Sequence, residues 1–178
     1  MQIARYWEQT AEFHAPDPEI PRIVRVLSAM ICQVEPKLQV EHIGSTSIDG
    51  CGGKGIIDLA VLYPAGLLSR ARETLDALGF QRQGGPEPFP EERPMRVGAI
   101  AHAGGFFRIH AHVIALHSSE HQELVWFRDT LRSNAKLRQD YEDFKKRILA
   151  SGICEPIAYC KAKGRFIEEL LKDFRIGQ

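Results

Sequence analysis

The stretch VEHIGSTSIDGCGGKGIIDLAVLYP, residues 40–64, decides the fold of this 178-residue chain. Its first residues alternate between apolar and polar side chains, which is typical of a short strand. A Gly-Ser turn and a glycine-rich loop follow. The apolar run at residues 56–63 then predicts a second strand that is buried on both faces.

Asp58 is the unusual residue of the second strand, because it is an acid among isoleucine, leucine and valine. A carboxylate in such a place costs free energy unless it is paired or binds a metal ion. Twelve residues separate it from Ser45 in the turn. The turn's backbone N–H groups and the hydroxyls of Ser45 and Thr46 can hold phosphate oxygens, and Gly44 permits close backbone approach. Taken alone, the turn is better explained as an ordinary turn and helix cap.

The rest of the chain separates strands from a run of helices. The spacing of apolar residues predicts helices over about 20–34 and 65–79, and short strands near 80–83, 95–101 and 106–116. From Ser118 onward the pattern is helical, in three segments divided by Asn134 and by the stretch from Gly152 to Pro156. This order predicts an α+β protein rather than repeated βαβ units.

Composition limits the class of function. Hydrophobic residues make up 44% and the formal net charge is zero, so no basic excess supports non-specific binding of nucleic acid. No apolar run reaches the roughly 20 residues of a membrane span, and residues 1–13 do not resemble a signal peptide. The four cysteines show no CxxC pair, which favours free thiols. We expect a cytoplasmic protein without a membrane partner.

Four segments in order carry a resemblance to a known family: VEHIGSTSIDG, KGIIDLAV, RIHAHV and WFRDTLR. They resemble the GrpB family, which is placed in the nucleotidyltransferase superfamily that includes DNA polymerase beta. The resemblance implies a single domain over residues 1–178, with a nucleotidyltransferase-like mixed or antiparallel sheet, flanking helices and a helical part at about 118–178. In that superfamily the Gly-Ser turn holds a triphosphate, and acids on the second strand bind magnesium.

The sequence departs from these patterns at three places. Asp49 stands where the family has proline before glycine, and Gly55 stands where it has proline after lysine, although Lys54 keeps the charge. Ala60 occupies the position of the superfamily's second acid, two residues after Asp58. A two-magnesium site needs carboxylates from at least two positions, so the standard site is incomplete here.

Two histidines offer other metal ligands. His110 and His112 are two apart in a predicted strand and therefore share one face. If that strand neighbours the strand of Asp58, the three side chains form a set of two imidazoles and one carboxylate. Such a set suits Zn²⁺, Mn²⁺ or Fe²⁺ better than Mg²⁺. The alternative is that the histidines are strand residues hydrogen-bonded to neighbours.

Three basic residues complete the candidate site. Lys54 lies between the turn and the acid and is predicted to assist catalysis by neutralising developing charge. Arg128 and Arg132 are four apart on one helix face and are candidates for phosphate binding, or else surface residues paired with Asp129.

Two functions remain open from the sequence. The first is a nucleotidyltransferase-like enzyme that binds a nucleoside triphosphate or another phosphorylated ligand and transfers a nucleotidyl group to a small acceptor. Its catalytic residues would be Asp58 and Lys54, and its cofactor a divalent metal, Mg²⁺ or Mn²⁺ or else Zn²⁺. The second is a non-catalytic module that binds a nucleotide or another anion and has a degenerate metal site.

Overall fold

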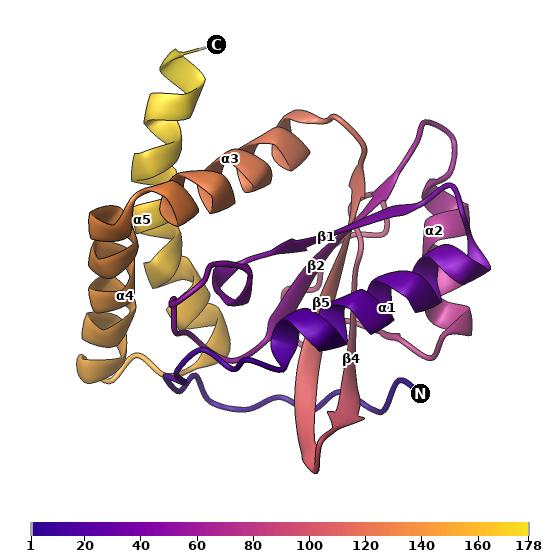
Figure 1. Cartoon of the computed structure of the whole chain (residues 1–178), viewed down its shortest axis with the longest axis horizontal. Helices are drawn as coiled ribbons and strands as arrows, with labels where there is room; N and C mark the ends of the chain where they lie inside the picture. Colours follow the sequence, from indigo (N-terminus) through magenta and orange to yellow (C-terminus); the bar gives the residue numbers. More distant parts are fainter. Residues whose placement is uncertain (1, 178) are drawn as a thin grey trace.

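One five-stranded sheet organises the protein, and the computed structural model describes residues 2–177. The strand order is β1-β2-β5-β4-β3 (Figure 1). Strand β2 pairs in parallel with β5, whereas the other neighbouring strands are antiparallel. The mixed sheet confirms the predicted α+β class. The strands are β1 (Gln39–Ile43), β2 (Ile57–Tyr63), β3 (Gln81–Arg82), β4 (Met95–His102) and β5 (Gly105–Ala115).

The helices fall into two groups, one before and within the run of strands and one after it. Helices α1 (Ile20–Val34) and α2 (Leu68–Ala77) cover one face of the sheet (Figure 1). Helices α3 (Ser119–Ser133), α4 (Ala135–Ala150) and α5 (Pro156–Ile176) follow the last strand and confirm the predicted helical C-terminal part. Within residues 2–177, no helix combines the length and the apolar character that crossing a membrane requires.

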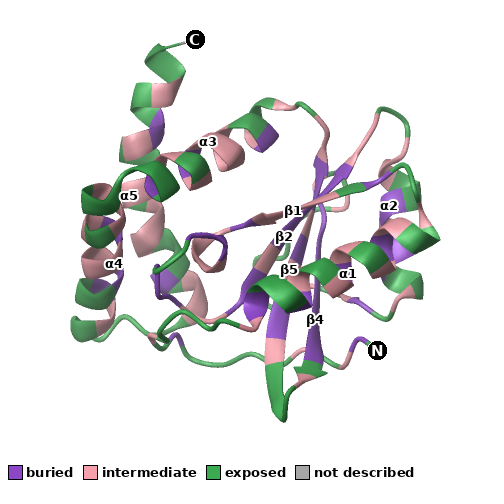
Figure 2. Ribbon diagram, in the orientation of Figure 1, coloured by how far each residue is buried: buried purple, intermediate pink, exposed green. Residues whose placement is uncertain are grey.

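The alternation of side chains along β2 sends them to two different cores. Ile57, Leu59 and Val61 are fully buried in the larger core, where they pack with the buried residues of α1 and α2. Figure 2 shows that α1 and α2 also have exposed faces, which point to solvent. Ala60 packs on the opposite face in a smaller cluster that reaches α3. Asp58 shares the face of Ala60, so its carboxylate points away from the larger core.

The residues before α1 form an extended segment that crosses the sheet edge, which we call the N-terminal strap (residues 3–14). Its backbone makes isolated bridges to Ala99 in β4 and to Gly53 in the glycine loop. The Tyr6 N–H also donates to the side chain of Gln81. The sequence pattern predicted no element here, because the strap has neither helical nor strand periodicity.

Candidate functional site

Asp58, His110 and His112 form one cluster at the centre of the sheet. The parallel pairing of β2 and β5 places Asp58 directly opposite His110. Asp58 Oδ1 lies 3.4 Å from His110 Nδ1 and 3.7 Å from His112 Nε2. One ligand atom from each residue lies within 4.8 Å of the others. The structure therefore brings together the three side chains that the sequence predicted as metal ligands.

The electrostatics of the cluster favour a charged carboxylate. Burial raises the pKa of the Asp58 carboxyl, but the two imidazoles beside it outweigh burial and hold that pKa well below its ordinary value. Burial also lowers the pKa of the His112 imidazole, against the effect of Asp58. An ionised carboxylate beside a neutral imidazole is the protonation state in which these groups bind a metal.

Each imidazole has a second partner on its far nitrogen. The Tyr6 hydroxyl of the strap lies 3.0 Å from His110 Nε2. Arg93 Nη1 lies 3.1 Å from His112 Nδ1. Because a guanidinium only donates, His112 Nδ1 must accept, and its proton is then on Nε2 and faces Asp58. Arg93 is itself held by an ion pair with Glu120.

The Gly-Ser turn touches the acid, as the sequence predicted. Gly44 has φ 71° and ψ −176°, a conformation that is essentially restricted to glycine. A Cβ atom added at Gly44 would overlap Asp58 Oδ2 and would lie 3.0 Å from Asp58 Cβ. Glycine at this position therefore serves both the backbone turn and the close approach of the carboxylate.

The three hydroxyls after Gly44 have different surroundings, although all three follow it in the short helix η1 (Ser45–Ser47). The Ser47 hydroxyl donates to the Gly44 carbonyl at 2.7 Å. The Thr46 hydroxyl donates to the Ile56 carbonyl and lies 2.9 Å from His42 Nε2. Ser45 lines the same cavity as Asp58. Of the three hydroxyls, Ser45 is thus the one placed beside the acid, and Thr46 is engaged in holding the turn.

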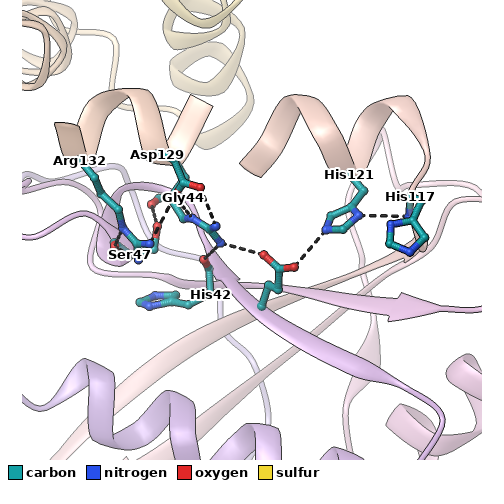
Figure 3. A network of polar contacts seen from close by, with 9 residues as sticks. His42, Gly44, Ser47, His117, His121, Asp129 and Arg132 are labelled. Atoms are coloured by element: carbon teal, nitrogen blue, oxygen red, sulfur yellow. Dashed lines mark hydrogen bonds and ion pairs between the residues drawn. The ribbon is translucent and has the colours of Figure 1, made fainter. Parts of the chain in front are cut away.

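Arg128 and Arg132 lie on α3 and do not line the cavity of Asp58. Arg132 donates from Nε and Nη2 to the Ser47 carbonyl, at 3.0 and 2.7 Å (Figure 3). Arg128 pairs with Glu41 and donates to the His42 carbonyl. Their contacts hold η1 and β1 against α3.

His42 is a half-buried histidine of this supporting layer. Burial, more than the nearby arginines, lowers its pKa to about 4, although Asp58 acts in the opposite direction. Because the Thr46 hydroxyl donates to Ile56, it must accept from His42 Nε2–H. His42 is therefore neutral at pH 7, and its Nε2–H donates to the Thr46 hydroxyl and so fixes the orientation of that side chain. His121 on α3 is buried, and its Nε2 lies 3.1 Å from Glu41 Oε1.

Because the pKa of His42 is lowered in the folded protein, we predict that the stability of the fold depends on pH. Between pH 6.5 and about 4 the unfolded chain protonates this imidazole and the folded chain does not. The free energy of unfolding should then fall as pH falls, by up to about 1.4 kcal/mol per pH unit from this group. His42→Gln, which keeps a donor for Thr46, should flatten that slope in urea titrations at each pH. The exposed His117→Asn is the matched control and should leave it unchanged.

A cavity of about 600 Å³ opens in front of the cluster, and we call it the Asp58 cavity. The strap, the glycine loop, β5, α4 and α5 all contribute to its lining. Its polar lining includes the predicted residues Ser45 and Lys54, together with Tyr6, Arg108, Lys145 and Lys163. Lys54 Nζ lies 3.4 Å from Cys160 Sγ and 5.5 Å from the centre of the Tyr159 ring.

Sequence reasoning missed Tyr6, Arg93, Lys145 and Lys163 as residues of this site. Each belongs to a segment that reaches the cavity only through tertiary packing. Lys163 lies in the basic run of α5, which by itself is typical of a solvated helix face. For Arg108 a signal was present, since it alternates with His110 and His112 on the same strand face.

The mixed sheet, the half-buried acid beside a Gly-Ser turn and the cavity in front define an α+β protein with a polar cavity that several cationic side chains line. The family model described as GrpB protein matches residues 10–173. This chain therefore belongs to the GrpB family, as the motifs predicted.

Relatives and a solved structure agree with this assignment. The UPF0157 protein BH1888 of Halalkalibacterium halodurans is 29% identical over 161 residues, covering 88% of this chain and 74% of that protein. A UPF0157 protein of Vibrio cholerae is 30% identical over 141 residues, covering 79% and 70%. The crystal structure of the conserved protein GrpB from Enterococcus faecalis superposes with a TM-score of 0.68 at 20% identity. It covers 92% of this chain and 99% of that one. This likeness shows a shared fold.

Proposed function

We propose that this protein binds a nucleotide or a related phosphorylated ligand in the Asp58 cavity and carries out metal-assisted nucleotidyl transfer to a small acceptor. The observation that carries the proposal is the convergence of Asp58, His110 and His112 directly beside Gly44. A structural role alone does not require two imidazoles, a carboxylate and a glycine-only turn at one open cavity.

The three side chains suit a divalent transition metal. Ligands about 2.1 Å from a tetrahedral ion stand about 3.4 Å apart. The distances from Asp58 Oδ1 to the two imidazole nitrogens, 3.4 and 3.7 Å, are close to that spacing. Two nitrogens and one oxygen favour Zn²⁺, Mn²⁺ or Fe²⁺. The metal would polarise a phosphoryl oxygen of the ligand.

The far partners of the imidazoles distinguish the two histidines. When His110 Nδ1 binds a metal, its proton moves to Nε2 and can be donated to the Tyr6 hydroxyl oxygen. His112 has the opposite arrangement, because Arg93 donates to Nδ1, the nitrogen that must carry the proton once Nε2 binds a metal. Arg93 therefore opposes metal binding at His112 until its side chain moves.

Replacing Arg93 should consequently tighten metal binding. In Arg93→Met the proton of His112 can settle on Nδ1, and we expect the affinity for Mn²⁺ or Zn²⁺ to rise by about 10-fold, the size of other effects on a ligand's outer partner. Isothermal titration measures this directly. Arg72→Met, another arginine paired with a glutamate, is the control. A weaker affinity in Arg93→Met would contradict the proton assignment.

The chain's own residues have separate roles in the proposed reaction. The backbone of the Gly44 turn and the Ser45 hydroxyl would bind phosphate oxygens beside Asp58. Lys54 would neutralise charge that develops on the transferred or leaving phosphate. Tyr6 would hold the orientation and the protonated nitrogen of His110.

A specific observation favours a second candidate, a non-catalytic module that binds a nucleotide or another anion. Ala60 pairs in register with His112, at the strand position where a second carboxylate would be needed for two metals. It is fully buried among apolar side chains instead. A module of this kind would keep the ligand cavity without transferring a group.

One experiment separates the two candidates. A thermal-shift screen would cross the common nucleoside triphosphates with Mg²⁺, Mn²⁺ and Zn²⁺, and stabilised pairs would then be assayed for release of pyrophosphate. Ligand binding raises the melting temperature whether or not turnover occurs. Metal-dependent pyrophosphate release supports the enzyme, and stabilisation without release supports the module. No stabilisation by any pair would overturn both.

A further inference from the structure

Four cationic side chains converge on the Asp58 cavity from four separate segments. Lys54 comes from the glycine loop, Arg108 from β5, Lys145 from α4 and Lys163 from α5. Among residues 2–177, no carboxylate oxygen lies within 4.0 Å of the charged nitrogens of any of the four. We call them the cationic wall.

This lack of pairing is unusual within the molecule. Arg96, the other strongly buried arginine, pairs with both Asp76 and Glu91. Lys161, at the rim of the same cavity, pairs with Glu87 at 2.8 Å. Arg108, in contrast, is 8% exposed and has no acidic partner. A largely buried charge without an opposite charge beside it is unfavourable, and an anionic ligand in the cavity would supply that opposite charge.

The acidic side chains that line the cavity have partners other than the cationic wall, with the exception of Glu8. Asp58 is held between two imidazoles. Glu155 accepts from the N–H groups of Ile157 and Ala158 and caps α5. Glu87 pairs with Lys161. Among residues 2–177, Glu8 makes no ion pair, and the lining holds five cationic side chains against four acidic ones. The four cations of the wall are the ones that no carboxylate within 4.0 Å neutralises.

Lys145 connects the cationic wall to the glycine loop. It is 1% exposed, and its ammonium donates to the Gly52 carbonyl and lies 3.3 Å from Cys51 Sγ. Its Nζ also lies 3.4 Å from where a Cβ atom on Gly53 would be. Burial lowers the pKa of Lys145, and a bound anion acts in the opposite direction.

We infer that the ligand carries a chain of at least two phosphates, and that the cationic wall binds this chain while Asp58 faces one end of it. This rests on the proposed function only in identifying the cavity as the ligand site. One phosphate, with a charge of about −1.5 to −2, would neutralise only part of the charge of these four side chains. The chain could belong to a nucleoside triphosphate or to inorganic polyphosphate.

The first test measures binding without metal. In EDTA, isothermal titration should show that tripolyphosphate binds the full chain at least about 10-fold more tightly than orthophosphate. ATP binding tighter than tripolyphosphate identifies the nucleotide as the source, and equal affinity identifies the free chain. Tripolyphosphate binding no tighter than orthophosphate overturns the inference.

Matched variants locate the binding. Lys163→Gln should weaken tripolyphosphate by about 10-fold or more, the value of one charge-assisted contact. Lys161→Gln, two residues away and paired with Glu87, should change it less than about two-fold. Equal losses in the two variants would show non-specific attraction and overturn the inference.

A footprint on the unaltered chain gives a second readout. Cys160 lies 3.4 Å from Lys54, whereas Cys154 is exposed outside the cavity lining. Bound tripolyphosphate should slow alkylation of Cys160 and leave Cys154 unchanged, as followed by mass spectrometry of the two peptides. Equal rates with and without tripolyphosphate contradict the inference. Mn²⁺ titration of the same sample is independent, so failure of the metal site and failure of the wall are distinguishable.

Discussion

Asp58→Asn is expected to weaken binding of Mn²⁺ or Zn²⁺ by about 100-fold or more, because even an outer partner of a metal ligand is worth 10- to 100-fold. The amide keeps the shape of the side chain but removes the charge that both imidazoles face. Any metal-dependent pyrophosphate release should disappear with it. Isothermal titration and the turnover assay measure the two effects separately.

The control for this variant is another acid of the same cavity. Glu87 lies at the rim and pairs with Lys161, away from the imidazoles, so Glu87→Gln should keep metal affinity. The melting temperature of Asp58→Asn is also informative, since loss of a buried charge should not unfold the protein. Undiminished Mn²⁺ binding in Asp58→Asn would rule out the proposed metal centre.

Gly44→Ala should be the most destabilising single methyl addition at the site. Alanine would be strained in the backbone conformation of Gly44, which is essentially restricted to glycine, and its Cβ would overlap the Asp58 carboxylate. Strain of this kind costs about 1–3 kcal/mol, and overpacking adds about 1–3 kcal/mol more. We expect a loss of roughly 3 kcal/mol or more in urea unfolding, together with weakened metal binding as the carboxylate is displaced.

Gly50→Ala separates the two causes. Gly50 also has positive φ, at 75°, but a Cβ atom there would meet nothing within 4 Å. This variant should show backbone strain alone and retain metal affinity. If Gly44→Ala proved as mild as Gly50→Ala, the close packing of the turn against Asp58 would be wrong.

The central geometry could be predicted because it depends on local rules. The side-chain period of a strand places His110 and His112 on one face, and a buried acid in an apolar strand must find partners. The structure brings these histidines to Asp58 because β2 and β5 are neighbours. From the sequence this neighbour relation was only a condition, because the period of a strand does not determine which other strand it pairs with.

The remainder depends on how helices pack, which no local pattern fixes. Arg128 and Arg132 share a helix face as predicted, but α3 directs that face to the backbone of the turn and to Glu41. From the sequence, Lys163 is expected on a solvated helix face. In the structure α5 packs against α3 and α4, and Lys163 lines the Asp58 cavity. Their roles in binding phosphate, and those of Gly44, Ser45, Thr46 and Lys54, stay predictions.

The N-terminal strap has a consequence for synthesis of the chain. Tyr6 emerges from the ribosome about a hundred residues before its partner His110, which corresponds to several seconds or more at about 5–20 residues per second. Such a contact between distant residues cannot form early. The contact of the strap with His110 must wait until β5 has been made, and the lining from α4 and α5 is added later still. The family model begins at residue 10, beyond Tyr6.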